Sequence, residues 1–263
     1  MKKSLLTLTV ISGLLFAGCK KEGCTDPLAT NYNENAQKDD GTCSYDTPQN
    51  SNYLTGTITE NTTLTADKVW ILGGRVTVVN GVILTIEPGT IIKGEVGVGA
   101  NASALIIARG AKLMAEGTEA SPIIFTTIAD EIQVGGFISP NLGPDFSGLW
   151  GGLIVLGNAP ISADADAVQI EGIPASDQNG LYGENTPTDN SGVLRYISIR
   201  HGGANIGEGN EINGLTLGGV GNGTVIEHIE VVGNQDDGIE FFGGTVNVSN
   251  TVVWNAGDDS YDV

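Results

Sequence analysis

The feature that most constrains the fold of this chain is a repeat of about 22 residues. The segment "IEHIEVVGNQDD" overlays "VSNTVVWNAGDD" with a step of 22, and "LTIEPGTIIKG" overlays "LIIARGAKLMA" with a step of 21. Short apolar runs alternate with turns rich in Gly, Asn and Pro, whereas a helical period is almost absent. Hairpins would instead need a two-residue turn every few residues. A recurrent period of this length, with variable insertions, predicts stacked coils.

The predicted fold is all-β, a parallel β-helix over residues 53–263 in which each coil carries two or three short strands. A single coil cannot bury its apolar face, so each strand should pair with its counterpart one coil later, about 4.8 Å away. "LRYISIRHGG" overlays "IEHIEVVGN" with a longer step of 32, and loops at 128–147 and 162–192 interrupt the period. The positions expected to face the interior are Leu84, Ile86, Leu105, Ile107, Ile229, Val231, Thr251 and Val253.

Composition narrows the classes of function. The chain has 31 acidic and 12 basic side chains, a formal net charge of −19. Nucleic acid is excluded as a partner on this ground, because its phosphates require Lys and Arg. Divalent cations, cationic partners and neutral glycans are compatible with such a surface.

Residues 1–18 are interpreted as an export signal and not as part of the fold. Two lysines precede an apolar run of about 12 residues, which is too short to span a bilayer. The following "FAGC" resembles a bacterial lipobox, with Phe16 where that pattern usually has Leu. The resemblance implies cleavage before Cys19, a lipid on its thiol, a tether over 19–23 and attachment to the outer membrane, facing either the cell surface or the periplasm. The alternative is an ordinary secretory signal.

Residues 24–45 form a unit of their own, and a polar linker follows at 46–52. Lipidation of Cys19 leaves Cys24 and Cys43, which can pair in an oxidising compartment. About 20 residues with almost no aliphatic side chains need a disulfide or a metal to fold. The segment resembles a Cys-bounded Asp/Asn-rich module of Bacteroidetes surface proteins, and it is either a stapled acidic spacer or a weak Ca²⁺ site. The candidate ligands of that site are Asp26, Asp39 and Asp40.

Five stretches of the β-helix portion are similar to a family of secreted or lipid-anchored right-handed β-helix proteins of the Bacteroidetes. The stretches are "IEPGTIIKG", "GLWGGLIVLGNAPI", "LRYISIRHGG", "INGLTLGGVGNGT" and "NQDDGIEFFGG". They are specific as a set and cover most of residues 53–263. The resemblance implies a right-handed, single-stranded parallel β-helix at the cell surface, and it leaves the function of the protein open.

Six acids near the end of the chain repeat with the step of one coil, so that each should stack on its counterpart. Like charges about 5 Å apart repel by roughly 1 kcal/mol in water and about 3 kcal/mol at an effective dielectric constant of 20. A bound Ca²⁺ would offset this repulsion, and so would shared protons. A third interpretation is that the acids only cap solvated turns. The candidate cation ligands are Asp236 with Asp258, Asp237 with Asp259, and Glu240 with Asp262.

Catalysis competes with metal binding, because polygalacturonase-type glycosidases are β-helices with an Asp pair on a coil face. The "GHG" and "RIK" landmarks of that family do not follow the Asp pairs here, so no catalytic residue is assigned. A lyase would need a base beside bound Ca²⁺, for which Arg200 is a candidate, although Arg195 and Arg200 are more simply exposed or salt-bridged. His201 and His228 are expected to be surface or turn residues.

The aromatic residues have two interpretations, as platforms for sugar rings or as stacked ladders inside the coils, and the second is favoured. The residues concerned are Trp70, Trp150, Trp254, Phe241 and Phe242.

The chain ends in mid-pattern at "GDDSYDV". Because an open coil exposes unpaired backbone groups, we expect further coils beyond residue 263 or a partner that covers the last coil. The sequence thus predicts an exported lipoprotein whose β-helix serves cell-surface binding or a structural role, with glycan or Ca²⁺ as partners. The alternative is a polysaccharide lyase or glycoside hydrolase of the pectin-lyase-like β-helix class.

Overall fold

The computed structural model describes residues 21–25, 31–38, 40, 42 and 52–263, apart from 208–209. The chain divides into two units after Ser51, and the second unit, Asn52–Val263, holds the coils. The predicted signal and lipidation site lie outside the described residues. Within the part of the chain that the structure describes, no helix has the length and apolarity needed to cross a bilayer.

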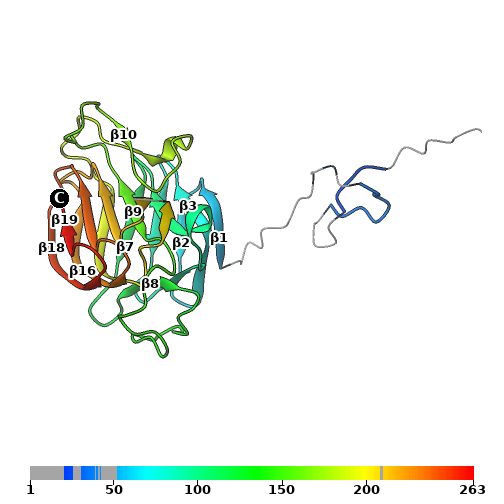
Figure 1. The fold of residues 1–263 in the computed structure, drawn as a ribbon, viewed down its shortest axis with the longest axis horizontal. Helices are drawn as coiled ribbons and strands as arrows, with labels where there is room; N and C mark the ends of the chain where they lie inside the picture. Colours follow the sequence, from blue (N-terminus) through cyan, green and yellow to red (C-terminus); the bar gives the residue numbers. More distant parts are fainter. Residues whose placement is uncertain (1–20, 26–30, 39, 41, 43–51, 208–209) are drawn as a thin grey trace, which may run out of the picture. The chain divides into compact units, whose positions relative to one another are not determined.

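Short strands and tight turns make up the second unit (Figure 1). The early strands are β1 (Tyr53–Ile58), β2 (Thr62–Leu64), β3 (Val69–Val78), β4 (Ile83–Ile86), β5 (Ile91–Gly94), β6 (Ala104–Ile107), β7 (Lys112–Glu116) and β8 (Ile123–Thr127). The middle strands are β9 (Leu153–Leu156), β10 (Val168–Gln169), β11 (Leu181–Tyr182), β12 (Gly192–Arg200), β13 (Asn205–Gly207) and β14 (Asn210–Glu211). The last strands are β15 (Leu215–Gly218), β16 (Val225–Asn234), β17 (Ile239–Phe242), β18 (Val248–Ala256) and β19 (Tyr261–Asp262). The 3-10 helices of the described residues are η1 (Gly99–Asn101) and η2 (Gln178–Gly180).

Parallel pairing between successive coils confirms the predicted all-β parallel β-helix. Fifteen strands join one sheet, in which β12 pairs with β7, β8 and β16, and β16 pairs in turn with β18. The small antiparallel pairs β10–β11 and β13–β14 belong to the loops. Figure 1 shows the strands of successive coils running side by side, with the segment after β8 and the segment carrying β10 projecting on opposite sides of the stack.

The register confirms the predicted step of 22 residues at both ends of the domain. Thr62 pairs with Leu84 near the start, and Ile226 pairs with Val248 near the end. The longer step of 32 is also confirmed, because Leu194 pairs with Ile226.

The predicted overlay with a step of 21 is wrong. Leu84 pairs with Leu113, and Leu105 pairs with Val76, so the coil between them has a step of 29. The segment that carries η1 lengthens this coil, and the two apolar patterns therefore do not lie on each other.

Apolar side chains on alternate strand positions fill the interior of the stack. Trp150 is fully buried and stacks on Phe125, with ring centroids 6.5 Å apart. Thr251 and Val253, in the last coil, are half-buried, and Val253 packs against the same core. The other predicted interior positions are all buried: Leu84, Ile86, Leu105, Ile107, Ile229 and Val231.

Candidate functional site

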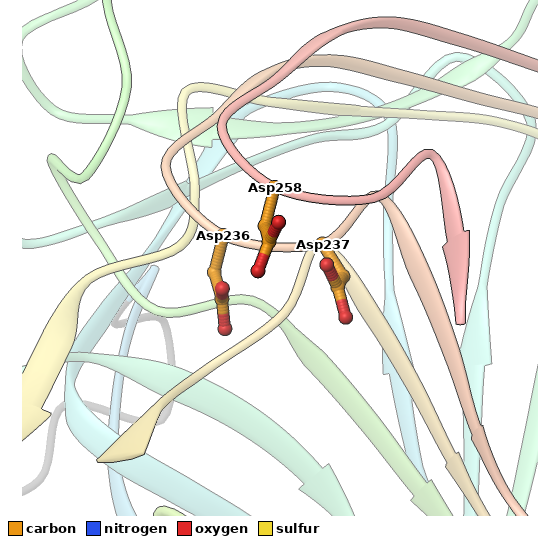
Figure 2. Close-up of side chains that lie close together, drawn as sticks. All are labelled: Asp236, Asp237 and Asp258. Atoms are coloured by element: carbon orange, nitrogen blue, oxygen red, sulfur yellow. The ribbon is translucent and has the colours of Figure 1, made fainter. Parts of the chain in front are cut away.

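Two turns of successive coils place the predicted acids side by side. Asp236 and Asp237 follow β16, and Asp258 follows β18. The two strands end in register, because Asn234 pairs with Ala256. Figure 2 shows the side chains of Asp236, Asp237 and Asp258 extending from the two neighbouring turns in the same direction.

Five of the six acids form two groups that share Asp237. Carboxylate oxygens of Asp236, Asp237 and Asp258 lie within 4.8 Å of one another, as do those of Asp237, Glu240 and Asp262. Glu240 and Asp262 are paired neighbours on β17 and β19. Asp237 is buried, whereas Asp258 and Asp262 are exposed. The step of one coil therefore concentrates negative charge around one buried carboxylate.

Asp259, the sixth acid, contacts the site through its backbone. Its N–H donates to Asp237 Oδ1 over 2.7 Å, and its carboxylate belongs to neither group. Burial is the main cause that raises the pKa of Asp237, and the charges of Asp262, Asp258 and Asp259 act in the same direction. The hydrogen bond from Asp259 opposes the shift. Burial thus disfavours the ionised form of Asp237, whereas a carboxylate in a solvated turn would not have this desolvation cost.

Glu240 is the most perturbed acid of the second group. Its pKa is raised to about 8, chiefly by burial and then by the charges of Glu171, Asp237 and Asp262. Asn213 donates a hydrogen bond from Nδ2 to Glu240 Oε2 and opposes the shift. With such a pKa, the protonated form of Glu240 is favoured at pH 7. A cation bound by these oxygens would displace that proton.

Two residues of the site were missed by the sequence prediction. Asn213 lies one coil before Asp237, because β15 and β17 pair through Leu215 and Ile239. The repeat of "NG" at 213–214 as "DG" at 237–238 is a signal that would have found it. Asn213 is fully buried, and its Oδ1 has no hydrogen-bond partner among the described residues. Glu171 comes from the loop at 162–192, where no period operates.

The weaker predicted site in residues 24–45 is described only in part. Asp40 accepts hydrogen bonds from the N–H and the hydroxyl of Thr42, which lower the pKa of its carboxyl. Cys24 is buried and disulfide-bonded. Its pairing with Cys43 stays a prediction, because that cysteine is not among the described residues. The other predicted residues outside the description are Cys19, Asp26 and Asp39.

The arginines considered for catalysis are engaged in ion pairs, as one prediction had it. Arg195 Nε lies 2.6 Å from Glu227 and its Nη1 lies 3.2 Å from Glu116. Arg200 Nη2 lies 3.7 Å from Glu230. Both arginines lie on β12, and within the described part of the chain no ion pair joins either of them to the acidic turns.

The two histidines both have a left-handed backbone, which fits turn positions. His228 stacks on Tyr196 with ring centroids 4.3 Å apart. His201 differs from a surface residue, because it is only 2 % exposed and its Nδ1 lies 2.8 Å from the carbonyl of Phe146. The loop at 128–147 covers it, which the sequence did not reveal.

The aromatic residues divide between interior and surface. Trp70 and Trp150 are buried, and Phe241 packs against the core, as expected. Phe242 instead meets the ring of Tyr182 edge to face at 5.9 Å. The expectation of interior stacking is wrong for Trp254, which is 61 % exposed because it points outward from β18.

A groove of about 730 Å³ adjoins the second carboxylate group. Its lining combines Glu240 and Asp262 with the aromatic side chains of Tyr182, Phe241 and Phe242. A protonated acid beside a solvated carboxylate, with apolar walls, is an arrangement that suits either a cation or the polar ring of a sugar.

Comparison with known proteins identifies the family of the fold. Residues 56–263 match the protein family described as the pectate-lyase-like β-helix domain. No curated protein matches the chain, and no solved structure does.

Proposed function

Because the chain belongs to the pectate-lyase-like β-helix family, we propose that it is a binding protein whose last coils hold Ca²⁺ and whose surface binds carbohydrate. The export signal and lipobox-like cysteine of the sequence support a lipid-anchored protein of the outer membrane. The acidic net charge of −19 supports a partner other than nucleic acid.

The observation that carries the proposal is the group of Asp236, Asp237 and Asp258. Three carboxylates from two coils approach within 4.8 Å, and one of them is buried. Among the described residues, no lysine or arginine forms an ion pair with Asp237 or Asp258. Ca²⁺ prefers six to eight oxygen ligands, and carboxylates supplemented by amide oxygens and water meet that preference. The Oδ1 of Asn213, which has no hydrogen-bond partner among the described residues, offers a further oxygen ligand for a cation beside the second group.

The test is a thermal melt of the chain with Cys19→Ser, in EDTA and in millimolar Ca²⁺. A ligand at a hundred times its Kd stabilises the folded state by about 2.7 kcal/mol. We expect Ca²⁺ to raise the Tm of this parent and to have little effect on a variant with Asp237→Asn and Asp258→Asn.

The matched control removes two charges elsewhere. Asp164→Asn with Asp166→Asn alters two exposed acids of the loop at 162–192 and should leave the Ca²⁺ effect intact. A Ca²⁺ effect that is equal in the parent and in the Asp237/Asp258 variant would refute the site. Absence of any Ca²⁺ effect on the parent would refute the metal-binding function.

The second candidate function is a glycoside hydrolase, and the specific observation that favours it is Glu240. Its raised pKa keeps an acid protonated near neutral pH, beside Asp262 and within a groove. Retaining glycosidases place an acid and a nucleophilic carboxylate about 5 Å apart. Glu240 would act as the general acid and Asp262 as the nucleophile. A lyase has less support, because Arg195 and Arg200 pair with glutamates.

A panel of plant and algal polysaccharides tests this second candidate. New reducing ends that disappear in Glu240→Gln but persist in Glu119→Gln, an exposed control, would support a hydrolase. Product levels equal to blank across the panel count against it.

A further inference from the structure

A second groove, which shares no lining residue with the first, lies under the loop at 128–147. Its volume is about 200 Å³, which suits one ring and not a large ligand. The loop contributes Phe137 and Ile138, β12 contributes Arg200, and β18 contributes Trp254. The groove thus lies between the outer face of the coils and a loop whose path the repeat does not predict.

Trp254 gives this groove a flat apolar wall. It pairs with Val232 across β18 and β16, and both side chains line the groove. The indole is 61 % exposed, whereas Trp70 and Trp150 are buried. An exposed indole can stack on the apolar face of a ring while leaving polar groups at the edge of that ring in contact with water.

His201 is among the residues that line the groove, and it holds a buried polar acceptor. Its Nδ1 lies 2.8 Å from the carbonyl oxygen of Phe146, and since a carbonyl only accepts, Nδ1 carries the proton. Burial is the main cause that lowers the pKa of His201, so the ring is neutral and Nε2 holds a lone pair. Nε2 is buried and has no hydrogen-bond partner among the described residues. An acceptor of this kind calls for a hydroxyl donor, from water or from a ligand.

The charge of the groove favours a neutral ligand. Arg200 donates from Nε to Ser198 Oγ over 2.8 Å and from Nη1 to the carbonyl of Phe137 over 2.9 Å. Its Nη2 lies 3.7 Å from Glu230, so the positive charge is already compensated. The net charge of −19 adds a general repulsion of anions.

We infer that this groove binds the ring of a neutral sugar, which stacks its apolar face on Trp254 and, as the groove-lining side chains move aside, donates one hydroxyl hydrogen bond to the buried Nε2 of His201. A sugar fits both features, because it combines an apolar ring face with hydroxyl donors at its edge. The inference rests on the carbohydrate binding of the proposed function and specifies where and which class of sugar is bound. It does not depend on the cation site.

The experiment titrates the chain with Cys19→Ser, at neutral pH, with hexasaccharides of cellulose, mannan and xylan. Tryptophan emission is the readout, because Trp254 is the one exposed tryptophan among the three. We expect at least one hexasaccharide to shift the emission to shorter wavelength with saturation. Oligogalacturonate, which is anionic, should bind more weakly.

Two variants and two matched controls locate the binding. Trp254→Ala removes the platform, and Val252→Ala is its control on the same exposed face of β18. His201→Asn keeps a left-handed backbone and an amide donor for Phe146 while removing Nε2. His228→Asn is its control at another left-handed histidine. Affinity for the variants is measured by calorimetry, since Trp254→Ala removes the fluorophore.

We expect Trp254→Ala and His201→Asn each to weaken binding by about tenfold or more, with the controls within about twofold of the parent. Circular dichroism melts confirm that each variant is folded. No binding of any hexasaccharide, binding of oligogalacturonate alone, or full affinity in Trp254→Ala would overturn the inference. Titrations in EDTA and in Ca²⁺ distinguish the two sites. Sugar binding without a Ca²⁺ effect on the Tm supports the groove alone, and a Ca²⁺ effect without sugar binding supports the cation site alone.

Discussion

Asp237 is the residue that links the two carboxylate groups of the acidic turns. It is 8 % exposed, and it still accepts a hydrogen bond from the backbone of Asp259. A buried carboxylate that meets neighbours of the same charge is costly when ionised, because burial and repulsion act in the same direction. A proton or a cation relieves that cost, so pH and metal should compete at this point.

Glu240 provides the residue-scale prediction. Its pKa is raised to about 8 in the folded chain from an ordinary value of 4.5. Protonation therefore favours folding, and this contribution is fully present below pH 4.5 and lost as the pH rises through about 8. In EDTA we expect the Tm to fall over this range, by an amount that reflects roughly 2 kcal/mol once solvent screening is allowed for. Glu240→Gln should flatten the curve.

Glu119→Gln is the control for this pH series, because it changes an exposed glutamate on another coil. The same slope in the parent and in Glu240→Gln, measured by thermal melts across the range, would contradict the assignment to Glu240. In Ca²⁺ the slope should shrink, since the cation displaces the proton.

At the scale of elements, the loop at 128–147 is held by one buried aspartate at its base. Asp130 is fully buried; Oδ2 accepts from the hydroxyl of Thr126 over 2.9 Å, and Oδ1 accepts from the N–H of Ile132 over 3.0 Å. Lys93 Nζ donates a hydrogen bond to the backbone carbonyl oxygen of Asp130 over 2.5 Å. Burial lowers the pKa of Lys93, and the charge of Asp130 opposes that shift. This network fixes the direction in which the loop leaves β8.

The element-scale prediction is that Asp130→Ala destabilises the fold by roughly 2–4 kcal/mol, because it leaves buried donors without acceptors. Asp130→Asn retains the shape and one acceptor, so its cost should be clearly smaller. Urea unfolding followed by circular dichroism measures both values. The Ala variant should also lose affinity for neutral hexasaccharides, because Phe137 and Ile138 leave their place in the groove. Equal stability of the Ala variant and the parent would show that the network does not anchor the loop.

At the scale of the whole molecule, the stack carries 31 acids against 12 basic residues. Parallel coils repeat the same turn every 22 residues near the C-terminal end, so like charges accumulate along one line instead of dispersing. Such self-repulsion destabilises the compact state and is screened by salt.

The prediction for the whole molecule is that the Tm in EDTA rises as NaCl increases from about 20 mM to about 500 mM. Added salt shortens the screening length and so weakens the repulsion between the acidic turns. Differential scanning calorimetry measures the effect. Ca²⁺ at matched ionic strength should raise the Tm further, because it binds specific oxygens. A Tm that is flat in NaCl would mean that the turn charges are already neutralised by protons.

Sequence alone was sufficient for the features that follow from the period. In a parallel stack, a residue and its counterpart one coil later become neighbours, so the spacing of Asp236 and Asp258 predicted their approach, and the apolar pattern predicted the burial of Ile229 and Val231. The resemblance in the coil motifs led to the same fold as the family match over 56–263.

Only the tertiary structure decided the features that depend on loops. Insertions change the length of a coil without leaving a periodic signal, which is why Leu84 meets Leu113 and not Leu105. Loops also bring distant residues together, as Glu171 comes to Glu240 and Phe146 covers His201. The physical reason is that a stack fixes neighbours within its own period, whereas the path of a loop is set by side-chain contacts that exist only in the folded chain.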